Sequence, residues 1–128
     1  MLELEVKNLN KKFGGLHVLK DVTFGIKGAE LIGLIGPNGA GKTTLTNILD
    51  GAIKPSSGTV YLNGQRIDQL PPFEVAKVGL GRTFQVTRSF RRMTVLENLY
   101  VPALAKHVSA DKSEVMNKAL EVLDFLTM

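Results

Sequence analysis

The chain has 128 residues, of which 44% are hydrophobic, and a formal net charge of +4 at pH 7. This length suits a single domain with a core of its own. The lack of cysteine excludes disulfides and thiolate chemistry, and no apolar run reaches the roughly 18 residues of a membrane-spanning helix. Charge and alternation begin directly after Met1, which argues against a signal peptide and favours a cytoplasmic protein.

The first thirty residues predict short strands. Residues 2–7 alternate between apolar and charged side chains, the period-two pattern of a strand with one buried face. Residues 10–15 are rich in turn formers and predict a break. Residues 18–20 and 22–26 then predict one further strand or a pair of strands.

The most informative stretch is an apolar run that leads into a glycine-rich loop ending in Lys-Thr-Thr. Leu31–Ile35 is short, apolar and without alternation, which predicts a buried parallel strand. Residues 43–50 predict a helix, with Gly51 placed to cap its C-terminus. Between strand and helix, residues 36–43 match the phosphate-binding pattern G-x-x-x-x-G-K-[ST] in full.

This loop suits the phosphates of a nucleotide. Gly36, Gly39 and Gly41 lack a Cβ, so the backbone can curl with its N–H groups pointing inward. The loop opens a helix, whose positive end faces the same anion. Lys42 adds a charge for the β- and γ-phosphates, and the Thr43 hydroxyl can bind Mg²⁺. The alternative is a glycine-rich turn with a chance Lys-Thr.

The middle of the chain predicts a hairpin and a short helix. After a turn, residues 59–62 predict a strand, and the Asn-Gly pair at 63–64 is a strong hairpin signal. A helix is expected over residues 71–78, because two prolines suit a helix start. Residues 82–85 predict the end of a further strand.

The last third predicts two helices. Thr94 and Glu97 form a capping box ahead of apolar residues at helical spacing. Pro102 falls within that helix, so we expect a kink or an interruption. A second, amphipathic helix is expected from Glu114, after a polar loop at 109–113. Together the elements predict an α/β protein in which an antiparallel sheet lies against a parallel core.

Four arginines fall in a stretch that contains no acidic residue: Arg82, Arg88, Arg91 and Arg92. Such a patch could face nucleic acid or anionic lipid headgroups. It could equally be a solvated face that also helps to hold a nucleotide. Base-stacking aromatic residues are sparse there, so no nucleic-acid partner is expected.

Four segments, in order and with the usual spacing, resemble the start of an ABC transporter ATP-binding subunit: residues 13–24, 36–44, 55–60 and 82–85. Residues 70–72, 81–85 and 93–99 look most like the branched-chain amino-acid uptake subfamily, and a lipopolysaccharide-export ATPase is a less close match. The resemblance implies a P-loop NTPase core with an antiparallel β subdomain over residues 1–88. Residues 89–128 would start a helical subdomain, and the single domain would be incomplete at its C-terminus.

The resemblance also implies roles for residues. Phe13 matches an aromatic residue that stacks on adenine, although a core Phe at a strand end is the alternative. Val18 would line the apolar side of the base pocket, or pack in the core. Gln85 matches a glutamine that senses Mg²⁺ and the γ-phosphate, so it joins Lys42 as a catalytic candidate and Thr43 as a metal candidate. Contacts to ATP are expected at Gly36, Pro37, Asn38, Gly39, Ala40, Gly41, Lys42, Thr43 and Thr44.

The implied function is coupling of ATP binding and hydrolysis to transport, with ATP and Mg²⁺ as cofactors. Two ATP-binding subunits, identical or different, would sandwich two ATP molecules. Membrane-spanning permease subunits would contact residues 86–93, which could otherwise be ordinary surface. The protein would then lie in the cytoplasm, on the inner face of the cell membrane.

Three parts that family members need do not occur in this sequence: a Leu-Ser-Gly-Gly-Gln signature, a second apolar strand ending in Asp-Glu, and a downstream switch histidine. Phosphoryl transfer depends on several such parts at once. The chain is therefore interpreted as the N-terminal part of an ATPase subunit. One alternative is a nucleotide-binding module without catalysis. Another is a small-molecule kinase or a GTPase. A GTPase would need a base-reading Asn-Lys-x-Asp motif, and none occurs in this sequence.

We predict that the 128-residue chain hydrolyses ATP only at the background rate, because half of the catalytic parts are absent from its sequence. Phosphate release from Mg-ATP should be the same for the chain and for Lys42→Ala. Turnover that disappears with Lys42 would contradict this expectation.

Overall fold

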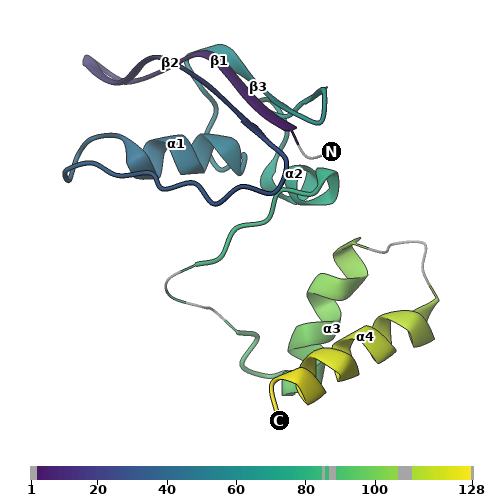
Figure 1. Cartoon of the computed structure of the whole chain (residues 1–128). Helices are drawn as coiled ribbons and strands as arrows, with labels where there is room; N and C mark the ends of the chain where they lie inside the picture. The colour runs from purple at the N-terminus through teal and green to yellow at the C-terminus, as the bar shows by residue number, and fades with distance from the viewer. Residues whose placement is uncertain (1–2, 85, 87–88, 107–110, 128) are drawn as a thin grey trace. The chain divides into compact units, whose positions relative to one another are not determined.

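The computed structural model describes residues 3–84, 86, 89–106 and 111–127. The chain divides after Arg82 into two compact units. The first unit holds a four-stranded antiparallel sheet with the strand order β2-β1-β3-β4. Its elements are β1 (Glu3–Phe13), β2 (Leu16–Lys27), α1 (Lys42–Leu49), β3 (Ser57–Leu62), β4 (Gln65–Arg66) and α2 (Pro72–Val78). Figure 1 shows the sheet lying over α1.

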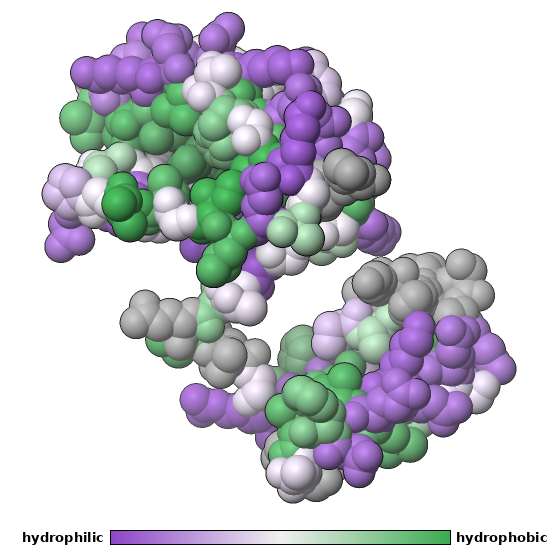
Figure 2. Space-filling model, in the orientation of Figure 1, coloured by the Kyte–Doolittle hydropathy of each residue, from purple (hydrophilic) through white to green (hydrophobic). Residues whose placement is uncertain are grey.

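The core of the first unit lies where the sheet meets its helices. The alternation along β1 buries Leu4 and Val6 and leaves Glu3, Glu5 and Lys7 accessible. Burying one such side chain fully stabilises the fold by about 1.5–3 kcal/mol. The charged side chains of the sheet form the hydrophilic rim seen in Figure 2. The buried cluster consists of Leu4, Val6, Leu9, Leu19, Leu45, Ile48, Val60, Leu62, Ile67 and Val75.

The break predicted over residues 10–15 is wrong for its first part, because β1 continues to Phe13. A side-chain network replaces the regular ladder there. The Asn10 Oδ1 accepts the Asp21 N–H at 3.1 Å and lies 2.9 Å from His17 Nε2. The Asn10 Nδ2 donates to Asp21 Oδ1 at 2.8 Å and to the Asn8 carbonyl at 2.9 Å. These bonds hold an irregular strand pair together where the sequence pattern indicates a turn.

The buried parallel strand predicted at Leu31–Ile35 is also wrong. Leu31 and Ile35 are fully exposed, and Ile32 and Leu34 are about half exposed. A strand needs a neighbour that satisfies its backbone N–H and C=O groups. Within the described ranges, the only sheet is the antiparallel one, and this segment pairs with none of its strands. The antiparallel part of the predicted architecture is present, and the parallel part has no strand here.

Three further local predictions for this unit are confirmed, and one is wrong. The helix expected over 43–50 is α1, and the Gly51 N–H donates to the Ile48 carbonyl at 3.2 Å. The Asn-Gly pair at 63–64 joins β3 to β4 as a two-residue hairpin. The helix expected over 71–78 is α2. The strand end predicted over residues 82–85 is wrong for residues 82–84, which pair with no strand of the sheet, and Gln85 lies outside the described residues.

Gly41 joins α1 to the sheet. Between the pairs Lys11–Leu19 and Lys12–His17 the register slips by one residue, which leaves Val18 without a partner on β1. Such a bulge re-aims neighbouring side chains. A Cβ added at Gly41 would lie 2.8 Å from Leu19 Cδ2 and 3.2 Å from the Val18 carbonyl oxygen. A Cβ at this position would force the Leu19 side chain and the Val18 backbone to shift.

A buried carboxylate ties β4 to β3. The Asp68 side chain accepts the Val60 N–H at 3.0 Å, Gln69 Nε2 at 2.8 Å and the Arg66 guanidinium at 3.0 Å. Burial alone would raise the pKa of Asp68, but the hydrogen bonds from Arg66, Val60 and Gln69 outweigh burial and lower the pKa.

The second unit is a pair of helices, α3 (Val95–Lys106) and α4 (Lys112–Phe125), which pack against each other. The predicted capping box is confirmed, because the Thr94 N–H donates to Glu97 Oε2 at 2.7 Å and the Glu97 N–H to Thr94 Oγ1 at 3.2 Å. Pro102 does not interrupt α3. The kink expected at Pro102 stays a prediction.

The α4 helix begins two residues earlier than predicted, because the Asp111 side chain accepts the Ser113 N–H and caps it. Val115 and Ala119 are its buried residues. Among the described residues, no helix combines the length and the hydropathy needed to cross a membrane.

We predict that Asp68→Ala lowers the free energy of unfolding by about 2 kcal/mol near pH 7, because it leaves the buried Val60 N–H without its acceptor. A carboxyl group with a lowered pKa stabilises the fold above its unfolded pKa, and this contribution is lost as the pH falls through the folded value. The difference in the free energy of unfolding between wild type and Asp68→Ala should therefore become smaller below about pH 4. Chemical denaturation at several pH values measures it.

The control for this change is Glu5→Ala, which removes an exposed ion pair with Lys7. Exposed pairs contribute little, so this variant should resemble the wild type. If the difference in the free energy of unfolding between wild type and Asp68→Ala stays constant from pH 7 to pH 3, the Asp68 charge does not contribute as proposed.

We also predict that Gly41→Ala destabilises the chain more than Gly39→Ala. Both glycines have a left-handed φ, +86° and +84°, so both substitutions carry the same backbone strain of about 1 kcal/mol. A Cβ at Gly39 meets nothing within 4 Å, whereas one at Gly41 overlaps β2. The overlap should cost about 1–3 kcal/mol more in denaturation experiments. Equal losses would show that β2 does not need the close approach.

Candidate functional site

A cavity of about 370 Å³ lies at the N-terminal end of α1. It has two walls that come from distant parts of the sequence. The β1–β2 hairpin supplies the apolar wall, and the loop that starts α1 supplies the polar wall. The lining residues are Leu16, Val18, Asn38, Gly39, Gly41, Lys42, Thr43 and Thr44.

The first turn of α1 is open to an anion. Its N-cap residue is Gly41, no side chain caps the turn, and the turn contains no acidic residue. The Leu45 N–H makes the first helical bond, to the Gly41 carbonyl at 2.8 Å. The N–H groups before Leu45 and the positive end of the helix dipole therefore remain to bind a negative group.

The Lys42 ammonium lies back over the loop. Its Nζ donates to the carbonyls of Gly36 at 2.7 Å and Pro37 at 2.8 Å. An ammonium has three donors, and these two bonds engage two of them. The Ala40 N–H donates to the Pro37 carbonyl at 3.2 Å and closes the turn. The loop thus places a positive charge beside the open helix end.

The structure brings most of the predicted site residues together. Val18 lines the cavity with residues 38, 39 and 41–44, while Gly36, Pro37 and Ala40 complete the same loop. Phe13 pairs with Leu16 across the hairpin and is 49% exposed. Gln85 lies outside the described residues, so its predicted role remains a prediction. Leu16 was missed, although its place directly after the Gly14–Gly15 turn, opposite Phe13, is a usable signal.

Arg82, one of the four arginines of the basic stretch, makes contacts within the first unit. Its Nη1 donates to Asp50 Oδ2 at 2.5 Å and to Asn47 Oδ1 at 2.6 Å. Both acceptors belong to the C-terminal end of α1, which favours a cation. Arg82 therefore holds the C-terminal end of the first unit to α1. The sequence carries no local signal for a contact over more than thirty residues.

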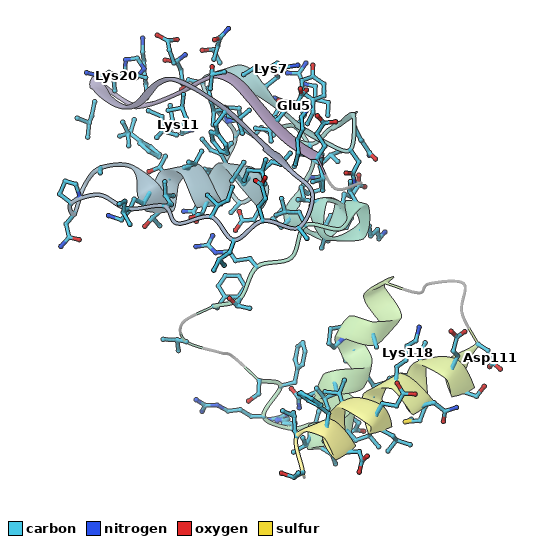
Figure 3. The ribbon with its side chains drawn as sticks, viewed as in Figure 1. Glu5, Lys7, Lys11, Lys20, Asp111 and Lys118 are labelled. Atoms are coloured by element: carbon cyan, nitrogen blue, oxygen red, sulfur yellow. The ribbon has the colours of Figure 1, made fainter. Side chains whose placement is uncertain are left out.

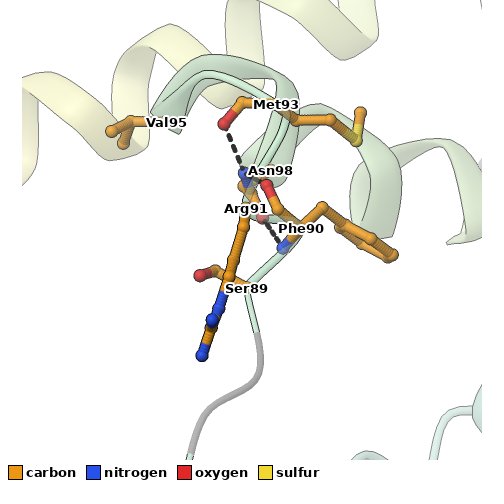
Figure 4. Close-up of a pocket in the computed structure, with 6 residues that line it drawn as sticks. All are labelled: Ser89, Phe90, Arg91, Met93, Val95 and Asn98. Carbon is orange, nitrogen blue, oxygen red and sulfur yellow. Dashed lines mark hydrogen bonds between the residues drawn. The ribbon is translucent and has the colours of Figure 1, made fainter.

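A second cavity, of about 430 Å³, lies in the second unit beside the start of α3. Figure 4 shows Asn98 at its centre. The Asn98 Oδ1 accepts the Phe90 N–H at 2.8 Å, and Nδ2 donates to the carbonyls of Thr94 at 2.9 Å and Met93 at 3.2 Å. One side chain therefore fixes the loop that carries Phe90, Arg91 and Met93, which are all exposed.

The chain is similar to known proteins in both sequence and structure. The family model described as ABC transporter matches residues 19–127. The chain is 48% identical over 98 residues to the high-affinity branched-chain amino acid transport ATP-binding protein LivG of Escherichia coli (strain K12). That match covers 77% of the chain and 38% of LivG.

Solved structures extend the similarity to the whole chain. The ADP conformation of MJ1267, an ATP-binding cassette of an ABC transporter, superposes with a TM-score of 0.81 at 33% identity and covers 99% of the chain. The dimeric post-hydrolysis state of the cassette MJ0796 bound to ADP and Pi superposes with a TM-score of 0.76 at 32% identity over 94% of the chain. The chain spans 54% and 56% of these two cassettes.

These similarities confirm the predicted fold class, an α/β P-loop NTPase. They cover the phosphate loop, α1 and both helices of the second unit. The chain belongs to the ABC transporter family.

Proposed function

We propose that this chain is the nucleotide-binding part of an ABC transporter and holds Mg-ATP in the cavity at the start of α1. The observation that carries the proposal is the uncapped first turn of α1 with the Lys42 ammonium beside it. Backbone N–H groups, a helix dipole and a lysine converge there, and this combination suits a polyphosphate.

Different residues of the loop are proposed to contact different parts of Mg-ATP. The backbone of residues 36–41 curves around the phosphates, and Lys42 gives its ammonium to the β- and γ-phosphates. The Thr43 hydroxyl is exposed in the first turn of α1, and an oxygen donor there fits Mg²⁺. Mg²⁺ held there would supply positive charge that offsets the negative charge of the phosphates. Gln85 is proposed as a further metal and γ-phosphate contact.

The β1–β2 hairpin is proposed to hold the base. Phe13 offers a ring for stacking, which is tolerant of base identity because it needs only a π-face. Leu16 and Val18 form the apolar wall of the cavity next to it. A phenylalanine donates no hydrogen bond, so the hairpin would bind a purine without reading its polar edge.

The transport role is proposed from the relatives. The name of LivG favours branched-chain amino-acid import over lipopolysaccharide export. The dimeric state of MJ0796 supports pairing with a second ATP-binding subunit. The loop fixed by Asn98 presents Phe90 and Met93 beside arginines, which suits a contact with a permease subunit at the inner face of the cell membrane.

We predict that the chain binds Mg-ATP saturably in a calorimetric titration and that Lys42→Ala weakens binding at least tenfold. Hydrogen bonds to charged groups contribute about 1.5–3 kcal/mol each, and one such bond corresponds to a factor of ten or more. Lys77→Ala, in α2, removes the same charge far from the loop in sequence and should bind like the wild type.

Two results would count against the proposal. The first is a wild-type chain that binds no Mg-ATP. The second is equal affinity for wild type and Lys42→Ala, which would show that nucleotide binds elsewhere. Circular dichroism spectra of the three proteins verify that each is folded.

A further inference from the structure

The Phe13 side chain does not itself line the cavity, but it lies on the same face of the β1–β2 hairpin as Leu16, which does. Phe13 pairs with Leu16, and residues opposite each other in an antiparallel pair project to the same face. Leu16 and Val18 line the cavity, so the Phe13 side chain projects toward the same side. The ring ends a strand and is 49% exposed, which leaves it few neighbours to fix its orientation.

Lys11 is one neighbour that does contact the ring. It lies two residues before Phe13 on the same strand, and this spacing places both side chains on one face. The Lys11 Nζ lies over the Phe13 ring, 4.9 Å from its centroid. The same Nζ donates to the Lys54 carbonyl at 2.7 Å. The ammonium is therefore held from two directions, by the ring and by the loop that follows α1.

This arrangement has a consequence for stacking. A flat ring has two faces, and a cation within about 6 Å of the centroid is attracted to one of them. With the Lys11 ammonium anchored on one face, the other face is left for a planar partner. Holding a ring in its binding orientation raises affinity, because less freedom is lost when the partner stacks.

We propose that Lys11 is a positioning residue for the base of the nucleotide: it anchors the Phe13 ring between its ammonium and the bound purine. The inference rests on the proposed nucleotide site and adds a residue to it. Lys11 acts through the ring and not on the phosphates, so its effect should depend on the presence of a base.

The chain contains a matched control on the same strand. Lys7 Nζ lies over the Tyr61 ring, 5.3 Å from its centroid, and pairs with Glu5 at 2.8 Å. Figure 3 shows Lys7 and Lys11 at different places along β1. Lys7→Met removes the same charge and the same kind of ring contact as Lys11→Met, but at Tyr61 of β3, which does not pair with a residue that lines the cavity, whereas Phe13 pairs with Leu16.

The experiment is a calorimetric titration of the chain, Lys11→Met, Lys11→Arg and Lys7→Met with Mg-ATP and with inorganic tripolyphosphate. Lys11→Met should weaken ATP binding about two- to fivefold and leave tripolyphosphate binding unchanged, as an exposed cation–π contact of this kind implies. Lys11→Arg keeps a cation for the ring and a donor for Lys54, so it should retain most of the ATP affinity. Lys7→Met should match the wild type for both ligands.

A double-mutant cycle tests the route of the effect. In a Phe13→Leu background, Lys11→Met should cause no further loss of ATP affinity, because the ring through which it acts is gone. Full additivity of the two changes would overturn the proposal.

The other possible results distinguish the positioning role of Lys11 from the nucleotide site itself. Equal losses for ATP and tripolyphosphate in Lys11→Met would make Lys11 a phosphate contact and overturn its positioning role. Unchanged or tighter ATP binding by Lys11→Met would also overturn that role, while the nucleotide site would stand. A wild-type chain that binds neither ligand would overturn the proposed function together with this inference.

Discussion

The close approach of Gly41 to β2 is the contact on which the site depends. At this point the carbonyl of Val18 and the side chain of Leu19 meet a backbone that has no side chain of its own. The one-residue slip between β1 and β2 aims both residues at the start of α1. As a result, the β1–β2 hairpin and the phosphate loop form the two walls of one cavity.

The contact between Gly41 and β2 explains why the β1–β2 hairpin and the phosphate loop act together in the proposed site. The loop supplies charge and N–H groups, which suit phosphate but cannot recognise a base. The hairpin supplies apolar and aromatic surface, which suits a base but has no strong attraction for an anion. Asn10, through its bonds to Asp21 and Asn8, keeps the irregular strand pair in register up to Phe13. A polar network in β1 therefore supports an apolar binding surface.

The local features of the chain could be predicted from the sequence. The Asn-Gly hairpin, the capping box of Thr94 and Glu97, the helix after the phosphate loop and the loop itself depend on residues within a few positions of each other. Backbone conformation and capping bonds are decided at that range. The motif also identified most residues of the candidate site, because a phosphate loop is continuous in the chain.

The rest needed the tertiary structure, because it depends on partners distant in sequence. Leu31–Ile35 has the composition of a buried strand, but burial requires neighbouring strands, and none among the described residues pairs with it. Arg82 was interpreted as part of a basic run, yet its guanidinium binds Asp50 and Asn47. Composition and spacing thus determined the local elements and identified the loop that is proposed to bind phosphate. Only folding decided which strands pair, where Gly41 meets β2 and which side chains surround Phe13, since those contacts join residues that the sequence keeps apart.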